Sequence, residues 1–412
     1  MKNKIVELQL SVILFFCTYV NAKAQTLLTW KDKSYRLTSE QLLNGFSSYD
    51  SLYRNSRFRS FHYTVSELSF IGYYELALKM DYAFMHKSND TLWNEDTVDR
   101  LKKKSEEYTP VPAQEFIYSK TKDRQIVIIN EAHANPMHRV FTTSLLKELY
   151  AQGFRYLALE ALGEDSLLNL SKFPLQENGS YTNDPQFGNM IREAIKLGYK
   201  FIAYEYGGDD WQTMREKGQA LNIKAIIDKD PKAKILVHCG YGHGSTDTTG
   251  REKLMGAYLE QLTGITLLNI DQITLSEHPN TNYEESAYLA LHADFPAVFL
   301  NKNKQVFEET SPNRIEVYHP KTIYKNGRPN WLFDAPDRHY FFLPKKKIKI
   351  SYPLLVLAFP VNENIQTSVP TDIIELTSEN EISQKALVLK KGLYTLLLRN
   401  STGEFSFNVN VK

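Results

Sequence analysis

Five short apolar segments between residues 125 and 270 constrain the fold of this chain more than any other feature. The first runs from Ile126 to Ile129 without alternating polar residues, as expected for a strand buried on both faces. Similar segments follow at 156–160, 201–205, 235–238 and 265–270. Helical patterns separate them, starting after Asn135 and Pro136 and then at 191–197, 211–227 and 251–262. Strands that alternate with helices predict an α/β fold with a mostly parallel central sheet and helices on both faces.

The remainder of the chain has a different character on each side of this core. Residues 25–112 are predicted to be mostly helical, including a charged helix from Asp96 to Tyr108. The α/β domain is expected at 113–345, with additional strands near 297–300, 314–318 and 340–343. From 346 to 412, alternating segments around turns such as Lys391-Gly392 predict a small β-sandwich module.

The first 24 residues have the organisation of a cleaved signal peptide. Lys2 and Lys4 precede an apolar run at 8–20, and Ala22-Lys23-Ala24 provides a small-x-small cleavage site. We therefore expect an exported protein that is periplasmic, outer-surface or secreted, with no membrane span after cleavage. The alternative is an uncleaved N-terminal anchor, although the run is short for a membrane span.

Charge and cysteine content exclude some classes of function. The chain has 49 lysine and arginine residues and 48 aspartate and glutamate residues, so its net charge is close to zero. Nucleic-acid binding is therefore not expected, because it requires a strongly basic surface. Only two cysteines are present, and Cys17 lies in the predicted signal peptide. Cys239 would then have no partner for an internal disulfide, and we expect it to be a small buried side chain rather than a nucleophile.

Acids and histidines gather where the predicted strands end. In open parallel sheets, ligands bind outside the carboxyl ends of the strands. The residues expected at this edge are Glu131, His133, Glu160, Glu205, His238 and His243. Charged groups at the ends of apolar strands cost desolvation energy unless they are paired or functional. The convergence predicts a functional site at this edge.

Two local patterns indicate what the site could do. Alternation in an extended segment places Glu131 and His133 on the same face. The pair could activate a water as a general base, or it could supply two metal ligands. His138 and Arg139 open the following helix, where N–H groups favour anions, so substrate contact is expected there. Glycines around His243 allow close backbone approach, and their N–H groups could face an oxyanion.

Four motifs in order resemble the erythromycin-esterase/ChaN-like superfamily, which includes TIKI- and TraB-type proteins. They are Ile128 to His133, Tyr156 to Glu160, the helical segment Met214 to Asn222, and Gly240-Tyr241-Gly242-His243. The resemblance covers the α/β portion only. Asn130 departs from the family pattern, which has glycine before the glutamate.

The resemblance implies an exported hydrolase that cleaves an ester or amide in a small-molecule or peptide substrate. Its catalytic residues would be Glu131, His133, Glu160, His243 and Arg215. Substrate contacts would come from Glu205, His238, His138 and Arg139. In a metal-free version, His133 is the general base; in a metal version, His133, His243 and Glu160 hold a divalent cation. The family also contains haem binders, so the alternative is a protein that binds haem or a metal without turnover.

Overall fold

The computed structural model describes residues 35, 37–43, 57–85, 91–179, 181–248 and 253–412. The predicted signal peptide, residues 1–24, lies outside the described residues. No helix within the described ranges is both long and apolar enough to cross a membrane.

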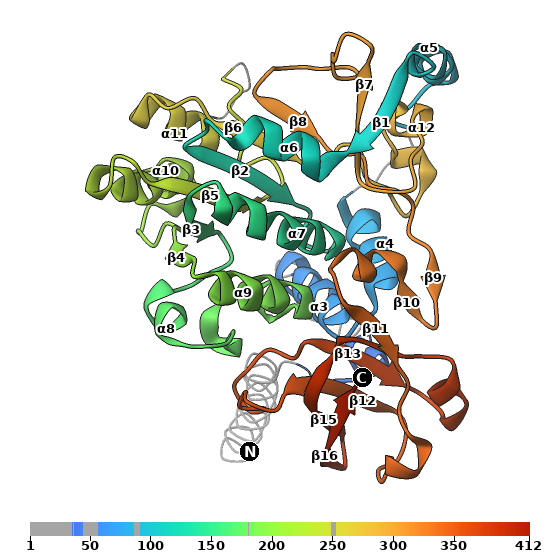
Figure 1. Cartoon of the computed structure of the whole chain (residues 1–412). Helices are drawn as coiled ribbons and strands as arrows, with labels where there is room; N and C mark the ends of the chain where they lie inside the picture. The colour runs from blue at the N-terminus through green and yellow to red at the C-terminus, as the bar shows by residue number, and fades with distance from the viewer. Residues whose placement is uncertain (1–34, 36, 44–56, 86–90, 180, 249–252) are drawn as a thin grey trace, which may run out of the picture.

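The centre of the molecule is a six-stranded sheet in which every neighbouring pair of strands is parallel. Its spatial order is β4-β3-β5-β2-β6-β8 (Figure 1). The strands are β2 Ile126–Glu131, β3 Phe154–Leu159, β4 Lys200–Ala203, β5 Lys234–Gly240, β6 Leu268–Asp271 and β8 Arg314–Glu316. The predicted α/β class with a mostly parallel sheet is therefore confirmed.

Helices cover both faces of this sheet, which explains why its strands are continuously apolar. One face bears α6 Ala113–Thr121, α7 Met137–Ala151 and α9 Pro185–Leu197, and the other bears α10 Trp211–Lys229 and α11 Met255–Thr263. Along β2, Val127 and Ile129 belong to the first core, whereas Ile126 and Ile128 belong to the second. Burial of one such side chain contributes about 1.5–3 kcal/mol, so both layers stabilise the sheet strongly.

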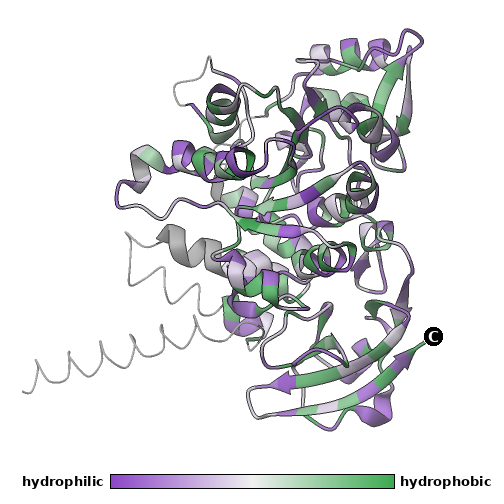
Figure 2. Cartoon of the chain, turned by 60° about the vertical axis from the view of Figure 1, so that its left-hand side comes forward, coloured by the Kyte–Doolittle hydropathy of each residue, from purple (hydrophilic) through white to green (hydrophobic). Residues whose placement is uncertain are grey.

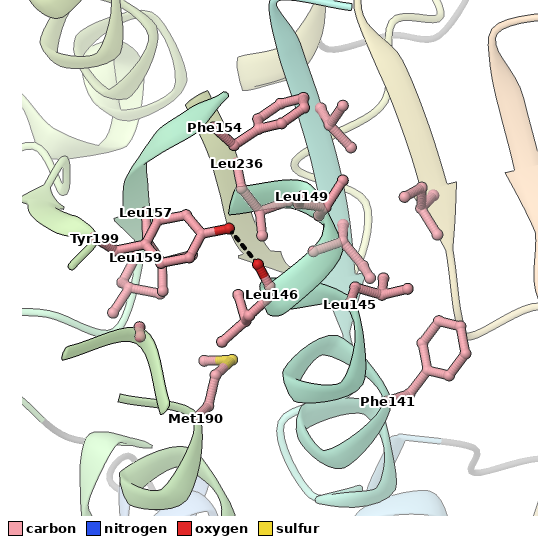
Figure 3. Close-up of a cluster of buried hydrophobic side chains, with 14 of the residues drawn as sticks. Phe141, Leu145, Leu146, Leu149, Phe154, Leu157, Leu159, Met190, Tyr199 and Leu236 are labelled. Carbon is pink, nitrogen blue, oxygen red and sulfur yellow. Dashed lines mark hydrogen bonds between the residues drawn. The ribbon is translucent and has the colours of Figure 1, made fainter. Parts of the chain in front are cut away.

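The first core is packed mainly by α7 and α9 against β2, β3 and β6. Phe141, Leu145 and Leu149 follow one another at four-residue spacing along α7, and they point into this layer (Figure 3). The hydroxyl of Tyr199 donates a hydrogen bond of 2.8 Å to the carbonyl of Leu146. This bond satisfies the one polar atom that the tyrosine brings into the layer.

The segment before the sheet contains one element that the sequence interpretation missed. Helix α5 (Glu95–Ser105) is shorter than the predicted 96–108 helix, and Tyr108–Pro112 forms β1, which pairs antiparallel with β7 (Ala297–Asn301). Two prolines lie within β1, and they are tolerated because β1 has only one partner strand. The other helices outside the central layers are α3 Arg57–Phe70, α4 Tyr74–Met85, α8 Asp165–Leu170 and α12 Ser286–Ala290.

The C-terminal part forms small antiparallel sheets, in agreement with the predicted β module. A four-stranded sheet of order β13-β12-β15-β16 lies beside the two-stranded sheet β11-β14, and they share one apolar core. The strands are β11 Arg338–Phe341, β12 Leu354–Pro360, β13 Asp372–Leu376, β14 Leu387–Lys390, β15 Gly392–Asn400 and β16 Gly403–Val411, with a further hairpin of β9 Tyr324–Lys325 and β10 Arg328–Pro329. Because β11 pairs with β14, this unit includes a strand that precedes residue 346, where the β module was predicted to begin.

Helices α3 and α4 join the two sheets. Their apolar residues share a core with β12, β13 and β15 and with Ala134, which follows the end of β2. Apolar residues are concentrated on the strands of the molecule, and the outer helical surfaces are more polar (Figure 2). The N-terminal helices therefore connect the β module to the edge of the parallel sheet where the predicted site lies.

Candidate active site at the carboxyl edge of the parallel sheet

The carboxyl ends of β2, β3 and β5 meet at one place. Glu131 is the last residue of β2 and pairs in register with Gly240, the last residue of β5. Glu160 directly follows β3, and its N–H donates to the carbonyl of His238 at 3.2 Å. The parallel register thus brings together residues that are more than 100 positions apart in the sequence.

Glu131 is buried, and Arg139 at the start of α7 holds it in place. Arg139 donates two hydrogen bonds to the carboxylate, Nε to Oε2 at 2.6 Å and Nη2 to Oε1 at 2.7 Å. A second buried acid, Asp184, lies 3.3 Å from Arg139 Nη1. Burial raises the pKa of Glu131, but Arg139 and His238 together hold that pKa well below its usual range. Glu131 is therefore a permanent carboxylate at neutral pH.

His133 is oriented by this carboxylate. Its Nδ1 lies 2.9 Å from Glu131 Oε1, and because a carboxylate only accepts, Nδ1 carries the hydrogen. The ring stacks on Tyr181 at 4.0 Å and meets the edge of Tyr241 at 5.1 Å. Its side chain is 20% exposed, and none of the described residues hydrogen-bonds to Nε2. In the tautomer that this bond selects, Nε2 of His133 keeps its lone pair and can accept a proton.

Gly240 makes room for that imidazole. A Cβ at this position would lie 2.3 Å from His133 Cε1 and 2.5 Å from Nε2, which are forbidden distances. It would also lie 3.3 Å from Glu160 Oε2. His133 and Glu160 thus approach the same point on β5. The N–H of Gly240 donates to Glu160 and is not available to an oxyanion, whereas Gly242 is exposed and its N–H has no partner among the described residues.

Arg215, in the first turns of α10, connects the other acids and the second histidine. Its Nη2 donates to Glu160 Oε1 at 2.6 Å and to Glu205 Oε2 at 2.7 Å, and its Nε donates to Glu205 Oε1 at 3.1 Å. Its Nη1 lies 3.0 Å from His243 Nε2, and the guanidinium packs over Trp211 at 5.0 Å. Glu205 follows the end of β4 rather than lying in the strand, and a third of its side chain is exposed.

His243 is held between a cation and an acid. Because a guanidinium only donates, His243 Nε2 accepts from Arg215 and Nδ1–H faces Glu216 Oε1 at 2.8 Å. Burial lowers the pKa of His243, but Glu216 and Glu160 outweigh it, so the net pKa is raised. Glu216 also accepts the N–H of Met255, at the first turn of α11, at 2.8 Å. The turn after β5 is therefore fixed to α10 and α11.

Three residues expected to contact substrate lie in the interior instead. His138 Nδ1 accepts the N–H of Ala132 at 3.0 Å and Nε2 lies 3.2 Å from Ser276 Oγ, so neither ring nitrogen is available. Arg139 is fully buried against Glu131 and Asp184. His238 is 2% exposed, and its Nε2 lies 3.5 Å from Glu131 Oε2. As placed, Arg139 and His238 border Glu131 from beneath the site, and His138 binds the backbone of the adjacent Ala132.

The side chains proposed as metal ligands are not arranged as a ligand set. The guanidinium of Arg215 hydrogen-bonds both Glu160 and His243, whose Oε1 and Nε2 lie 3.6 Å apart, and His133 is directed to Glu131. Within the part of the chain that the structure describes, no group of three or more His, Cys, Asp or Glu side chains is positioned to hold a metal ion. His133, His243 and Glu160 therefore do not fit the expected cation, and we derive no step through one.

Sequence reasoning missed Asp184, Tyr181 and Glu216. Asp184 had a local signal, because an aspartate before Pro185 is typical of a helix N-cap, and it does cap α9. Its ion pair with Arg139 is a tertiary contact that this pattern does not reveal. Tyr181 lies in a short 3-10 helix without periodicity, and Glu216 resembles any exposed helical acid in the sequence. Cys239 is buried and free, as expected.

Comparisons with known proteins give little further information. No family model matches the chain, and no curated protein matches it. Among solved structures, the type III effector HopBA1 is 15% identical, with 43% of this chain and 93% of that chain covered, at a TM-score of 0.28. Two bacterial protein toxin structures are 14% and 17% identical and cover 50% and 48% of this chain, also at 0.28. The chain spans less than half of either toxin, at 45% and 46%. These TM-scores do not establish a shared fold.

Proposed function

We propose that this protein is an exported hydrolase in which the Glu131–His133 pair activates water to cleave an ester or amide bond. The observation that carries the proposal is the geometry of His133. One ring nitrogen is held by a buried carboxylate at 2.9 Å, the other has no hydrogen-bond partner among the described residues, and the side chain is 20% exposed. This is the arrangement that a general base requires, since its proton-accepting atom must reach a water.

The reaction assigns a role to each side chain. His133 Nε2 takes a proton from water as the water oxygen attacks the carbonyl carbon of the substrate. Glu131 stabilises the imidazolium that forms, and Arg139 keeps Glu131 ionised. His133 then returns the proton to the leaving oxygen or nitrogen, so that the protein is unchanged after hydrolysis.

Arg215 positions other groups in this proposal. Two carboxylates already occupy its donors, so it orients Glu160 and Glu205 toward the substrate rather than binding an oxyanion alone. Glu205 contributes substrate contact from the rim, where its side chain is partly exposed.

The test is a panel of ester and peptide substrates assayed with the wild-type protein and with His133→Gln. We expect hydrolysis of at least one substrate and a loss of about 10²- to 10⁴-fold in the variant, the usual contribution of a general base. His292→Gln is the matched control, because that side chain is 84% exposed and pairs only with Asp294. Equal rates for His133→Gln and wild type would contradict the proposal.

The same preparation tests the alternative of a ligand-binding protein. Haem is titrated into the wild-type protein while absorbance is recorded in the Soret region. A saturable Soret change without hydrolysis of any substrate would support haem binding over catalysis. No Soret change together with His133-dependent hydrolysis would remove that alternative.

A further inference from the structure

A second cavity lies away from the sheet edge, where α7 and α9 meet the β module. Its volume is about 330 Å³, within the size of small-molecule sites. In Figure 1, α7 and α9 run beside each other next to β11 and β13. The charged residues that line the cavity are Lys147, Arg192, Glu193, Lys196, Arg338 and Lys390. Five of these six are cations.

Most of the positive charge is only partly compensated. Arg192 is paired with Glu363 through Nε at 2.8 Å and Nη2 at 2.6 Å. Lys196 and Lys390 share the single carboxylate of Glu193, at 3.7 and 3.6 Å. At least one of these two lysines therefore lacks a full counter-charge.

Two further cations form no salt bridge with any described residue. Arg338 donates from Nη1 to Gln186 Oε1 at 2.8 Å and to the carbonyl of Leu332 at 3.2 Å. No described carboxylate lies within salt-bridge distance of Arg338, although its side chain is partly buried. Burial lowers the pKa of this guanidinium, with the more distant Asp372 opposing. Lys147, on α7, forms no ion pair or hydrogen bond within the described ranges.

A partly buried cation without an acid is costly unless something supplies the missing negative charge. Guanidinium groups bind oxyanions through parallel N–H donors, and lysine adds a mobile point charge. Val388, Leu389 and Tyr394 give the same cavity an apolar wall, which suits a carbon framework. The cavity thus combines the features of a site for an organic anion.

We propose that this cavity binds a compact organic molecule that carries two or more oxyanion charges, either phosphate or carboxylate. The site is separate from the Glu131–His133 pair and does not depend on the proposed hydrolysis. Its residues come from both the α/β domain and the β module, so occupancy would also hold these two parts together.

The test is isothermal titration of the full-length protein with pyrophosphate and with citrate at constant ionic strength. We expect saturable binding of one equivalent of at least one probe, and the preferred probe identifies phosphate or carboxylate as the ligand chemistry. Lys147→Gln should weaken binding about tenfold, the effect of losing one charge-assisted hydrogen bond. Arg338→Gln should weaken it at least as much.

The control is Lys232→Gln, which removes the same charge from an exposed position outside the cavity. It should bind the probe as the wild type does, and so should His133→Gln. The proposal is overturned if neither probe shows saturable binding, or if Lys232→Gln and Lys147→Gln weaken binding equally. Because Lys147 is exposed and unpaired, its variant remains decisive even if Arg338→Gln does not fold.

Discussion

At the scale of single residues, position 240 controls the orientation of His133. Gly240→Ala would place a methyl group 2.3 Å from the imidazole, so the ring must move away from Glu131. We expect hydrolysis to fall about 100-fold, the effect of a displacement of about 1 Å in a catalytic group. The free energy of unfolding should fall by about 1–3 kcal/mol from overpacking.

Substrate hydrolysis and urea unfolding measure both effects. Gly403→Ala is the control, because a Cβ there would meet nothing within 4 Å. If Gly240→Ala retained the wild-type rate, the close approach of His133 to β5 would have no functional importance.

Arg139 is predicted to be a determinant of stability as well as of the site. Arg139→Gln leaves Glu131 and Asp184 buried without their shared cation. Removing one partner of a buried ion pair costs about 3–5 kcal/mol of stability. Urea unfolding at neutral pH should show that the free energy of unfolding falls by this amount. Arg100→Gln, at an exposed position on α5, should change stability by less than about 0.5 kcal/mol.

The sequence predicted which side chains lie at the sheet edge better than it predicted which of them are buried. Glu131, His133 and Glu160 were placed at the sheet edge because each lies where an apolar strand ends, and an uninterrupted apolar run followed by a charged residue is visible in the sequence. The sequence does not reveal that His138 and Arg139 lie beneath the site, because the burial of residues at the start of a helix depends on which other segments pack against them. In this case Asp184 and Ser276, both distant in the sequence, determine it.

At the scale of elements, Glu216 connects α10, the turn after β5 and the first turn of α11. Glu216→Gln removes the carboxylate that raises the pKa of His243, so that pKa should fall. A histidine whose pKa is raised in the folded protein stabilises the fold fully at pH values below its unfolded pKa. This stabilisation is lost as the pH rises through the folded-state pKa. The variant should therefore lose stability mainly at acidic pH.

An NMR titration of the imidazole resonances measures the first effect, and urea unfolding at several pH values measures the second. Glu177→Gln, an exposed acid outside the site, provides the comparison. An unchanged pKa for His243 in Glu216→Gln would show that this ion pair is not formed in solution.

The order of the central elements along the chain follows from the sequence, but their boundaries do not. The five apolar segments predicted β2 to β6, because burial on both faces leaves a continuous apolar run, and β8 was expected only as an additional strand near 314–318. The spatial order of the strands in the sheet was not predicted. Strand β1 was missed because Pro110 and Pro112 argue against a strand unless its partner is known. The pairing of β11 with β14 is likewise a contact that no local pattern encodes.

At the scale of the whole molecule, buried neutral histidines should make the protein sensitive to acid. Burial lowers the pKa of His319 to about 3, with Asp271 opposing, and neither ring nitrogen has a hydrogen-bond partner among the residues that the structure describes. The unfolded histidine takes up a proton below about pH 6.5, so stability falls between there and about pH 3. The slope from one such group is at most about 1.4 kcal/mol per pH unit.

His319→Leu removes this proton linkage and the two unpaired polar atoms. Its free energy of unfolding should depend less on pH across that window, and at pH 7 it should be close to that of the wild type. Urea unfolding over the acidic range measures this, with exposed His292→Leu as control. An identical slope for His319→Leu and wild type would show that other groups dominate the acid response.

The proposed mechanism requires Glu131 and His133 to act as one unit. The measurement that tests this most directly is a double-mutant cycle on the hydrolysis rate with Glu131→Gln, His133→Gln and the double variant. Residues that act together show strongly non-additive losses, so we predict that the double variant is no slower than His133→Gln alone. Independent losses that multiply in the double variant, or no loss in either single variant, would contradict the proposed mechanism.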